Sequence, residues 1–142
     1  MALENTSIVT ISIDESYCSV FSNTQIPQTE LGSALWLSEQ QASLNFRYRS
    51  SPSGYESDWH VAGDPTLIIV CGGCLEIELR DGSQKRFSVG DKFIARDFSP
   101  SDATFDPLNH GHRARVIGEE EFSAVHIKLG KAPSSLREIK LS

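Results

Sequence analysis

Period-two alternation of apolar and polar residues is the feature that most constrains the fold of this chain. Side chains two apart in a strand lie on the same face, so such alternation is typical of strands with one apolar face. Helical periodicity is nearly absent, and its best candidate, residues 31–41, is diluted by Gly32 and serines. The alternating segments are Val9–Ile13, Leu44–Tyr48, Leu75–Leu79, Phe87–Val89 and Val125–Leu129. The sequence therefore predicts an all-β sandwich or barrel with little helix.

The chain of 142 residues has a common size for one domain. We expect a single domain over residues 1–142, with N-terminal strands in 7–30, a barrel core over about 44–129 and a polar tail over 130–142. The turn signals Gly72-Gly73 and Asp81-Gly82 predict a three-stranded antiparallel meander over Thr66–Phe87. Residues 98–109 contain two prolines and predict a long loop that packs onto the domain.

Charge and hydropathy exclude several classes of partner. Lys and Arg number 13 against 19 Asp and Glu, and the formal net charge of −6 argues against a nucleic-acid partner. No apolar run approaches the length of a membrane span, and Met1–Thr6 lacks the cationic segment of a signal peptide. Three cysteines leave an odd one in any pairing scheme, which fits a reducing compartment. We therefore expect a cytoplasmic protein with no membrane partner.

An ordered set of short motifs resembles the cupin family. The spacing from Gly54 to His60, closed by Gly73, is similar to the first cupin motif, and Gly90-Asp91 and His112 are similar to the second. The whole set resembles small single-domain cupins of mostly uncharacterised function: Asp58-Trp59-His60-x-Ala62, Gly73-x-Leu75-Glu76, Asp81-Gly82, Arg86-Phe87-x-x-Gly90-Asp91 and Gly111-His112-x-x-Arg115. The resemblance implies a cupin-type antiparallel double-stranded β-barrel, jelly-roll-like, with a small-molecule site inside it. It also implies a homodimer, in which strand Ile8–Ile13 could pair across two subunits.

The candidate metal ligands are His60, His112 and His110. Metal-binding cupins carry a His-x-His-x3-Glu pattern, but the second and third positions of that pattern are Ala62 and Thr66 in this chain. Neither residue supplies a normal ligand for a divalent metal. His110 lies two residues before His112 and could complete a three-nitrogen set for one Zn²⁺, Fe²⁺ or Ni²⁺ ion. In the alternative interpretation, His110 is solvated in its loop and the other two histidines are hydrogen-bonded residues of a barrel lining.

Further polar side chains are candidates for binding a small-molecule substrate: Arg47, Tyr55, Thr66 and Arg96. Arg47 and Arg49 lie on the strand face opposite its apolar residues. Inside a barrel they would anchor a carboxylate or phosphate, whereas outside they would form a charged face toward solvent or another subunit. His126 also lies opposite an apolar strand face, and the sequence leaves open whether that side is cavity or solvent.

Trp59, Cys71 and Cys74 are predicted to have structural rather than functional roles. Strand alternation points Trp59 away from the side of His60, where it would pack against a second sheet or subunit. Cys71 and Cys74 form a Cys-x-x-Cys motif on a predicted turn, without the helix start that stabilises a thiolate. We expect them to be free thiols facing each other on neighbouring strands.

Three functions stay open at this point. The first is a metal-dependent enzyme, an oxygenase, isomerase or lyase acting on a small molecule, which the two matched histidines favour. The second is a metal-free small-molecule binding or sensing module, which Ala62 and Thr66 favour. The third is a barrel that serves only for dimerisation. The fold alone does not choose among them, because one fold supports many functions.

Overall fold

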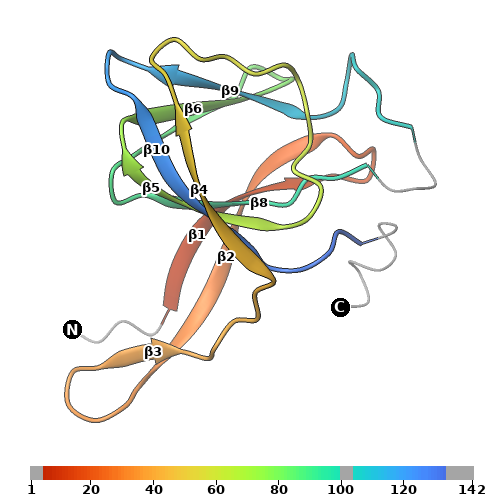
Figure 1. Ribbon diagram of the computed structural model, residues 1–142. Helices are drawn as coiled ribbons and strands as arrows, with labels where there is room; N and C mark the ends of the chain where they lie inside the picture. The colour runs from red at the N-terminus through yellow and green to blue at the C-terminus, as the bar shows by residue number, and fades with distance from the viewer. Residues whose placement is uncertain (1–4, 100–103, 134–142) are drawn as a thin grey trace.

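The fold consists of strands and connecting loops (Figure 1). The computed structural model describes residues 5–99 and 104–133; the tail beyond Pro133 and the middle of the expected loop, 100–103, lie outside the described residues. Within the described ranges there are ten strands and no helix, and residues 31–41 contribute only a short strand. The same part of the chain accordingly contains no helix capable of crossing a membrane. The predicted all-β class is confirmed.

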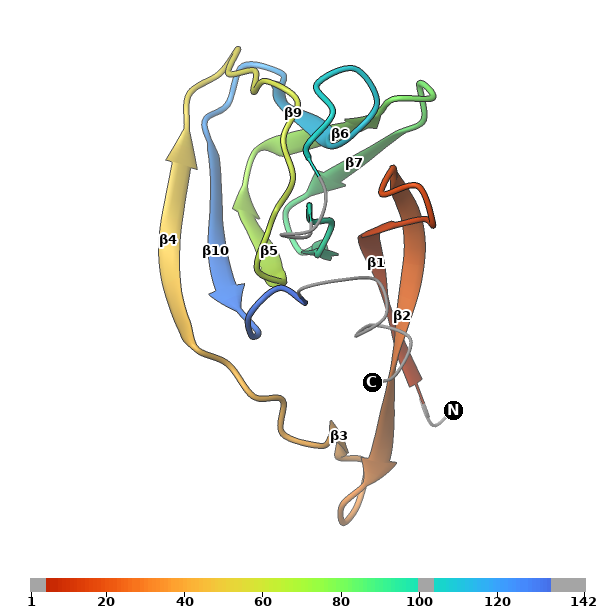
Figure 2. The same cartoon turned by 90° about the vertical axis from the view of Figure 1, so that its right-hand side faces the viewer.

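The strands form two sheets. In spatial order, the larger sheet contains β3 (Trp36–Ser38), β2 (Ser19–Glu30), β1 (Asn5–Ile13), β8 (Lys92–Ala95), β5 (Thr66–Gly72), β10 (Phe122–Lys128) and β4 (Asn45–Ser51). The smaller sheet contains β7 (Gln84–Ser88), β6 (Cys74–Leu79) and β9 (His112–Ile117). Figure 2 shows the larger sheet bending from β1 and β2 on one side to β10 and β4 on the other, with the smaller sheet between them.

The N-terminal strands are part of the larger sheet rather than an appendage. β1 pairs with β2 along its whole length, and Val9–Ile11 also pair with β8 in parallel orientation. All other strand pairs are antiparallel. The expectation that Ile8–Ile13 pairs across two subunits is therefore wrong, because the centre of this strand has no free edge.

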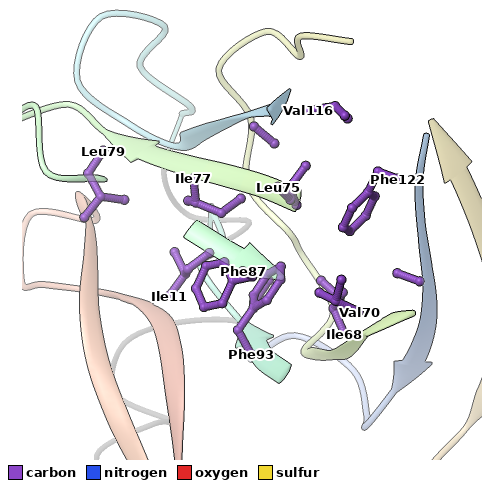
Figure 3. Close-up of a cluster of buried hydrophobic side chains, with 13 residues drawn as sticks. Ile11, Ile68, Val70, Leu75, Ile77, Leu79, Phe87, Phe93, Val116 and Phe122 are labelled. Carbon is purple, nitrogen blue, oxygen red and sulfur yellow. The ribbon is translucent and has the colours of Figure 1, made fainter. Parts of the chain in front are cut away.

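The apolar core lies between the two sheets (Figure 3). Phe87 of the smaller sheet stacks on Phe93 of the larger one, with ring centroids 4.3 Å apart. Strand alternation places the apolar residues of β6 and β9 toward this core, as predicted, and turns Arg113 and Arg115 outward. The cluster comprises Ile11, Ile68, Val70, Leu75, Ile77, Leu79, Phe87, Phe93, Ala95, Ala114, Val116, Phe122 and Ala124. Burial of each large side chain contributes roughly 1.5–3 kcal/mol.

The predicted meander over Thr66–Phe87 is only half correct. β6 and β7 form the expected hairpin at Asp81-Gly82, but β5 and β6 belong to different sheets, so the chain turns a corner at Gly73 instead of folding back. Gly73 has a φ of +72°, and a Cβ at this position would lie 2.6 Å from the Glu121 carbonyl oxygen. The expectation that Cys71 faces Cys74 on a neighbouring strand is wrong for the same reason, although both thiols are free.

Gly73→Ala tests the corner, and Gly118→Ala is its matched control. Gly118 has a similar φ of +84°, but a Cβ there meets nothing within 4 Å. We expect the control to lose about 1 kcal/mol of unfolding free energy, since both variants share the left-handed backbone strain. Gly73→Ala should lose roughly 1–3 kcal/mol more, because its methyl group overlaps backbone. Urea unfolding measures both values, and equal losses would contradict the close packing of this corner.

Candidate functional site

A cavity of about 370 Å³ lies between the two sheets. Five of the seven candidate metal- and substrate-binding residues line it: Arg47, Tyr55, His60, Thr66 and His112. The remaining lining residues are Arg49, Ser51, Ser57, Val61, Ala62, Ile68, Leu75, Ile77, Phe93, Ala95, Ala114, His126 and Lys128. A concave site with apolar walls and a few converging polar groups is the usual form of a small-molecule pocket.

Arg96 and His110 lie outside this set. Arg96 is exposed and follows the cavity-lining Ala95, so strand alternation turns it away. His110 accepts a hydrogen bond at Nδ1 from the Asp106 backbone N–H (2.9 Å), and its Nε2 lies 3.1 Å from the Ser16 carbonyl oxygen. The expected set of three histidines is therefore not formed. Its physical reason is Gly111, whose φ of +87° turns the chain before β9 begins at His112.

His60 and His112 do come together. Each backbone N–H donates to the carbonyl oxygen of the other residue, at 2.9 and 2.8 Å, and the ring centroids are 4.6 Å apart. Gly111 permits this approach, because a Cβ there would lie 2.7 Å from the His60 carbonyl oxygen. Ala62 and Thr66 line the same cavity, as their motif positions predict, although residue 62 lies in an irregular segment before β5.

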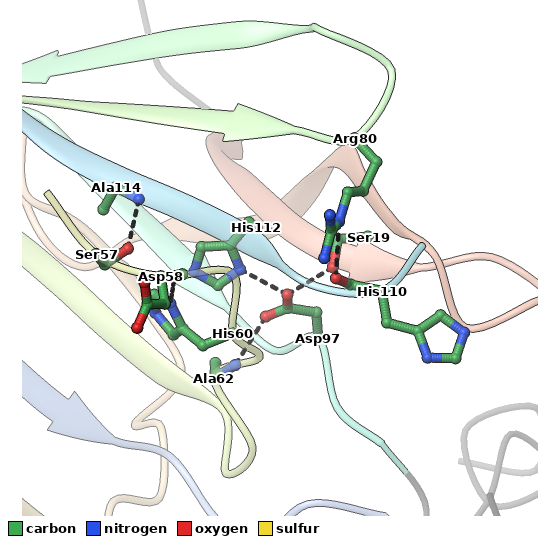
Figure 4. Close-up of polar contacts among 10 residues, drawn as sticks. All are labelled: Ser19, Ser57, Asp58, His60, Ala62, Arg80, Asp97, His110, His112 and Ala114. Atoms are coloured by element: carbon green, nitrogen blue, oxygen red, sulfur yellow. Dashed lines mark hydrogen bonds and ion pairs between the residues drawn. The ribbon is translucent and has the colours of Figure 1, made fainter. Parts of the chain in front are cut away.

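Asp97 positions His112, and sequence reasoning missed it. Its carboxylate is fully buried and accepts a hydrogen bond from His112 Nδ1 at 2.6 Å (Figure 4). The same carboxylate also accepts from Ser19 Oγ (2.6 Å) and the Ala62 backbone N–H (3.0 Å). Residue spacing could have identified it. Asp97 lies two residues after Ala95 and four after Phe93, so in an extended chain it shares their inward face, where it is an acid among apolar residues.

His60 is oriented by the backbone. Its Nδ1 lies 2.8 Å from the Asp58 carbonyl oxygen, which can only accept a hydrogen bond. Burial lowers the pKa of His60 below its ordinary value, while the bond to Asp58 opposes this effect. The imidazole is therefore neutral at pH 7, with Nδ1 protonated and the lone pair on Nε2. His112 Nδ1 is likewise engaged, by the Asp97 carboxylate, so in their neutral forms the two side chains offer two Nε2 acceptors.

The cavity lining does not fit a divalent metal site. Two oriented imidazoles resemble the supported ligands of metal centres. The described residues of the lining include no carboxylate and no cysteine, however, and no group of three metal-binding side chains occurs in the described part of the chain. Arg47, Arg49 and Lys128 occupy the lining as cations. His126 also lines the cavity but forms no metal-binding group of three with His60 and His112, so a dication held by that pair would have two protein ligands and like-charged neighbours.

One wall of the cavity is basic. Arg47 and Arg49 project from β4, and His126 and Lys128 project from β10, where His126 is the register partner of Arg47. This geometry places both arginines on the cavity side, the first of the two alternatives left open by the sequence. The Arg49 guanidinium lies 5.5 Å from the Tyr55 ring centroid and donates from Nε to Ser51 Oγ at 3.2 Å.

His126 also belongs to the cavity. Burial, together with the charges of Arg49 and Arg47, lowers the pKa of His126 to about 4. Its Nε2 is buried and has no hydrogen-bond partner. Buried polar atoms are nearly always paired, so an unpaired one in a cavity wall marks a position where a ligand or water binds.

Trp59 packs outside the cavity, on the side away from His60. Its ring lies under the guanidinium groups of Arg80 and Arg113, whose carbons are 4.0 and 4.9 Å from the ring centroid. It is therefore covered by cationic side chains of the same chain rather than by the second sheet. Such cation–π contacts at partly exposed positions contribute about 0.5–1 kcal/mol each.

Comparison with known proteins identifies cupin structures among the similar folds. No protein-family model matches the chain, and no curated protein matches it significantly. A cupin-2 domain containing protein from Shewanella frigidimarina is 21% identical, over 59% of this chain and 68% of that chain, with a TM-score of 0.41. The Schizosaccharomyces pombe Cnp3 cupin domain is 12% identical, over 99% and 94%, with a TM-score of 0.46. A protein from Neisseria meningitidis is 18% identical, over 65% and 85%, with a TM-score of 0.40.

The hydrogen bonds of the histidine pair predict their tautomers. At pH 8, two-bond ¹H–¹⁵N NMR correlations should show Nδ1 protonated and Nε2 unprotonated in both His60 and His112. In Asp97→Asn the new carboxamide can donate to Nδ1, so His112 should shift toward the Nε2-protonated tautomer. His60 serves as the internal control and should not change. An Nε2-protonated His112 in the wild type would contradict the assigned geometry.

The lowered pKa of His126 predicts a pH dependence of stability. Since its pKa is about 4 when folded and about 6.5 when unfolded, the unfolded chain binds the extra proton between these values. The contribution of His126 to stability is complete above about pH 6.5 and is lost as the pH falls toward 4. Unfolding free energies of wild type and His126→Gln should run parallel above pH 7. Below it the wild type should fall more steeply, and profiles parallel throughout would refute the assignment.

Proposed function

We propose that this chain is a cupin whose cavity binds a small molecule without a resident metal. The observation that carries the proposal is the orientation of His60 and His112. Each uses Nδ1 to hydrogen-bond the protein, which leaves Nε2 as an acceptor in the neutral imidazole. Although His126 also lines the cavity, no group of three metal-binding side chains occurs in the described part of the chain. Such a pair can accept hydrogen bonds from hydroxyl or N–H groups of a bound molecule.

The size and composition of the cavity support this proposal. Its volume of about 370 Å³ lies within the range of small-molecule sites. Apolar side chains such as Ile68 and Phe93 form part of its surface, and Tyr55 lies among them as an amphipathic contact. The motif resemblance to cupins supports the same kind of internal site.

A second candidate function is proton transfer on the bound molecule. The buried Asp97 carboxylate lies 2.6 Å from His112 Nδ1, and this pairing stabilises an imidazolium if Nε2 takes a proton. His112 would then act as a general base in an isomerase or lyase, two of the reaction classes expected from the sequence. The oxygenase alternative depends on a metal and gains no support from the lining residues.

The expected assembly and location stay predictions. The outer face of β4 exposes Phe46 (64%) and Tyr48 (79%), and an exposed apolar face of this kind supports a homodimer. A cytoplasmic location continues to rest on the sequence.

Metal analysis combined with fragment screening tests the proposed function. Protein purified without chelator should contain well under one equivalent of transition metal, and Zn²⁺ or Ni²⁺ should bind no tighter than in the millimolar range. NMR screening of small polar fragments should shift His60 and His112 resonances in the wild type, with binding reduced about tenfold in His112→Gln. Arg96→Gln, which lies outside the cavity, is the control and should bind as the wild type does.

Two results would count against this function. Stoichiometric micromolar metal binding that disappears in His60→Ala, but persists in His110→Ala, would establish a metal site instead. The absence of any fragment that shifts the histidine resonances would leave the cavity without a binding role.

A further inference from the structure

Strand β4 reverses the usual distribution of polar and apolar side chains. Its aromatic residues Phe46 and Tyr48 face outward, while Arg47 and Arg49 line the cavity. Arg47 is at an exposed position, whereas Arg49 is half-buried, and moving a guanidinium partly out of water costs free energy unless the charge is paired. Among the described residues, neither Arg47 nor Arg49 forms an ion pair with a carboxylate. The fold therefore retains cationic groups in the cavity without a protein counterion.

The environment of Arg49 favours an anion from outside the chain. Its guanidinium lies over the rings of Tyr55 and Phe122, at 5.5 and 5.2 Å from their centroids, and only Nε is engaged, by Ser51 Oγ. The terminal nitrogens therefore retain donors for a further partner. The neighbouring aromatic rings lower the local dielectric, which strengthens a charge-assisted hydrogen bond formed there.

His126 contributes an independent observation on the same wall. It is the register partner of Arg47 on β10, and its buried Nε2 has no partner. Lys128, the remaining cation of this wall, lies 3.4 Å from Asp64 and is already neutralised by that carboxylate. The unpaired polar groups of the wall are thus two guanidinium groups and one imidazole nitrogen, gathered at adjacent strand positions.

The opposite part of the cavity differs in chemistry. His60 and His112 present Nε2 acceptors there, so the cavity combines unpaired cationic donors at one end with neutral acceptors at the other. Arg49 lines the cavity together with both His60 and His126. A molecule that satisfies both ends carries an oxyanion at one end and a hydroxyl or N–H donor at the other.

We propose that Arg47, Arg49 and His126 bind the oxyanion of a small organic acid, a carboxylate or a phosphate group. This inference rests on the proposed function and names the class of its ligand. The planar guanidinium of Arg49 suits a two-point contact with either group. His126 Nε2 completes the site when it carries the proton of the neutral imidazole.

Titration calorimetry with a matched set of probes tests the inference: succinate, its neutral analogue succinamide, and inorganic phosphate. Succinate or phosphate should bind wild type at least tenfold more tightly than succinamide, and preference between the two anions distinguishes carboxylate from phosphate recognition. Arg49→Gln should weaken anion binding about tenfold or more, and Arg47→Gln severalfold. Arg49→Lys retains the charge and should recover part of the loss. Arg96→Gln is the exposed control and should bind as the wild type does.

The possible failures are distinguishable. Circular dichroism and the melting temperature establish that each variant is folded, and Arg47→Gln, at an exposed strand position, tests the site if Arg49→Gln unfolds. If neutral fragments shift the histidine resonances while succinate and phosphate bind no better than succinamide, the anion inference fails and the proposed function stands. If anion binding is unchanged in Arg47→Gln and Arg49→Gln, the inference also fails. If neither charged nor neutral probes bind, both fail together.

Discussion

The buried carboxylate of Asp97 is the interaction on which the site depends. It accepts hydrogen bonds from Ser19 at the start of β2, from Ala62 in the segment before β5, and from His112 at the start of β9. Three segments that are distant in sequence thus meet at one group on the chain following β8. A fully buried carboxylate is costly to leave unpaired, so these contacts act as a unit. The position of His112, and through the shared backbone bridge that of His60, follows from it.

Around this anchor the interior divides into two regions of different character. The side chains of β1, β6 and β7 pack with Phe93 into an apolar core, where Phe87 and Phe93 stack. Toward β4 and β10 the lining becomes basic and a cavity replaces close packing. Burial of the apolar core supplies the stability that allows unpaired cationic groups to persist in the cavity, as is common for functional sites. The separation of these two regions is the physical basis for proposing an internal ligand.

Much of the fold and part of the site could be predicted from the sequence. Period-two alternation identified five of the ten described strands, β1, β4, β6, β7 and β10. The inward faces of β6 and β9 were correct residue by residue, including the outward Arg113 and Arg115. The pairing of His60 with His112 followed from their motif positions. The prediction for His110 failed because it assumed an extended chain through Gly111, which instead adopts a left-handed conformation. Asp97 was missed because its partners Ser19, Ala62 and His112 are distant in sequence and come together only in the folded chain.

The sequence by itself determined the local properties of this protein: which segments form strands, which residues share a strand face, and where turns are favoured. These depend on side-chain size and backbone preference over a few residues. Tertiary structure alone decided that the polar faces of β4 and β10 line the interior, that β5 and β6 belong to different sheets, and that Arg47, Arg49 and His126 gather beside the histidine pair. The physical reason is that alternation separates two faces of a strand without specifying which is covered. Which face is covered depends on how strands pair, and the pairing joins segments that are distant in sequence, such as β4 and β10.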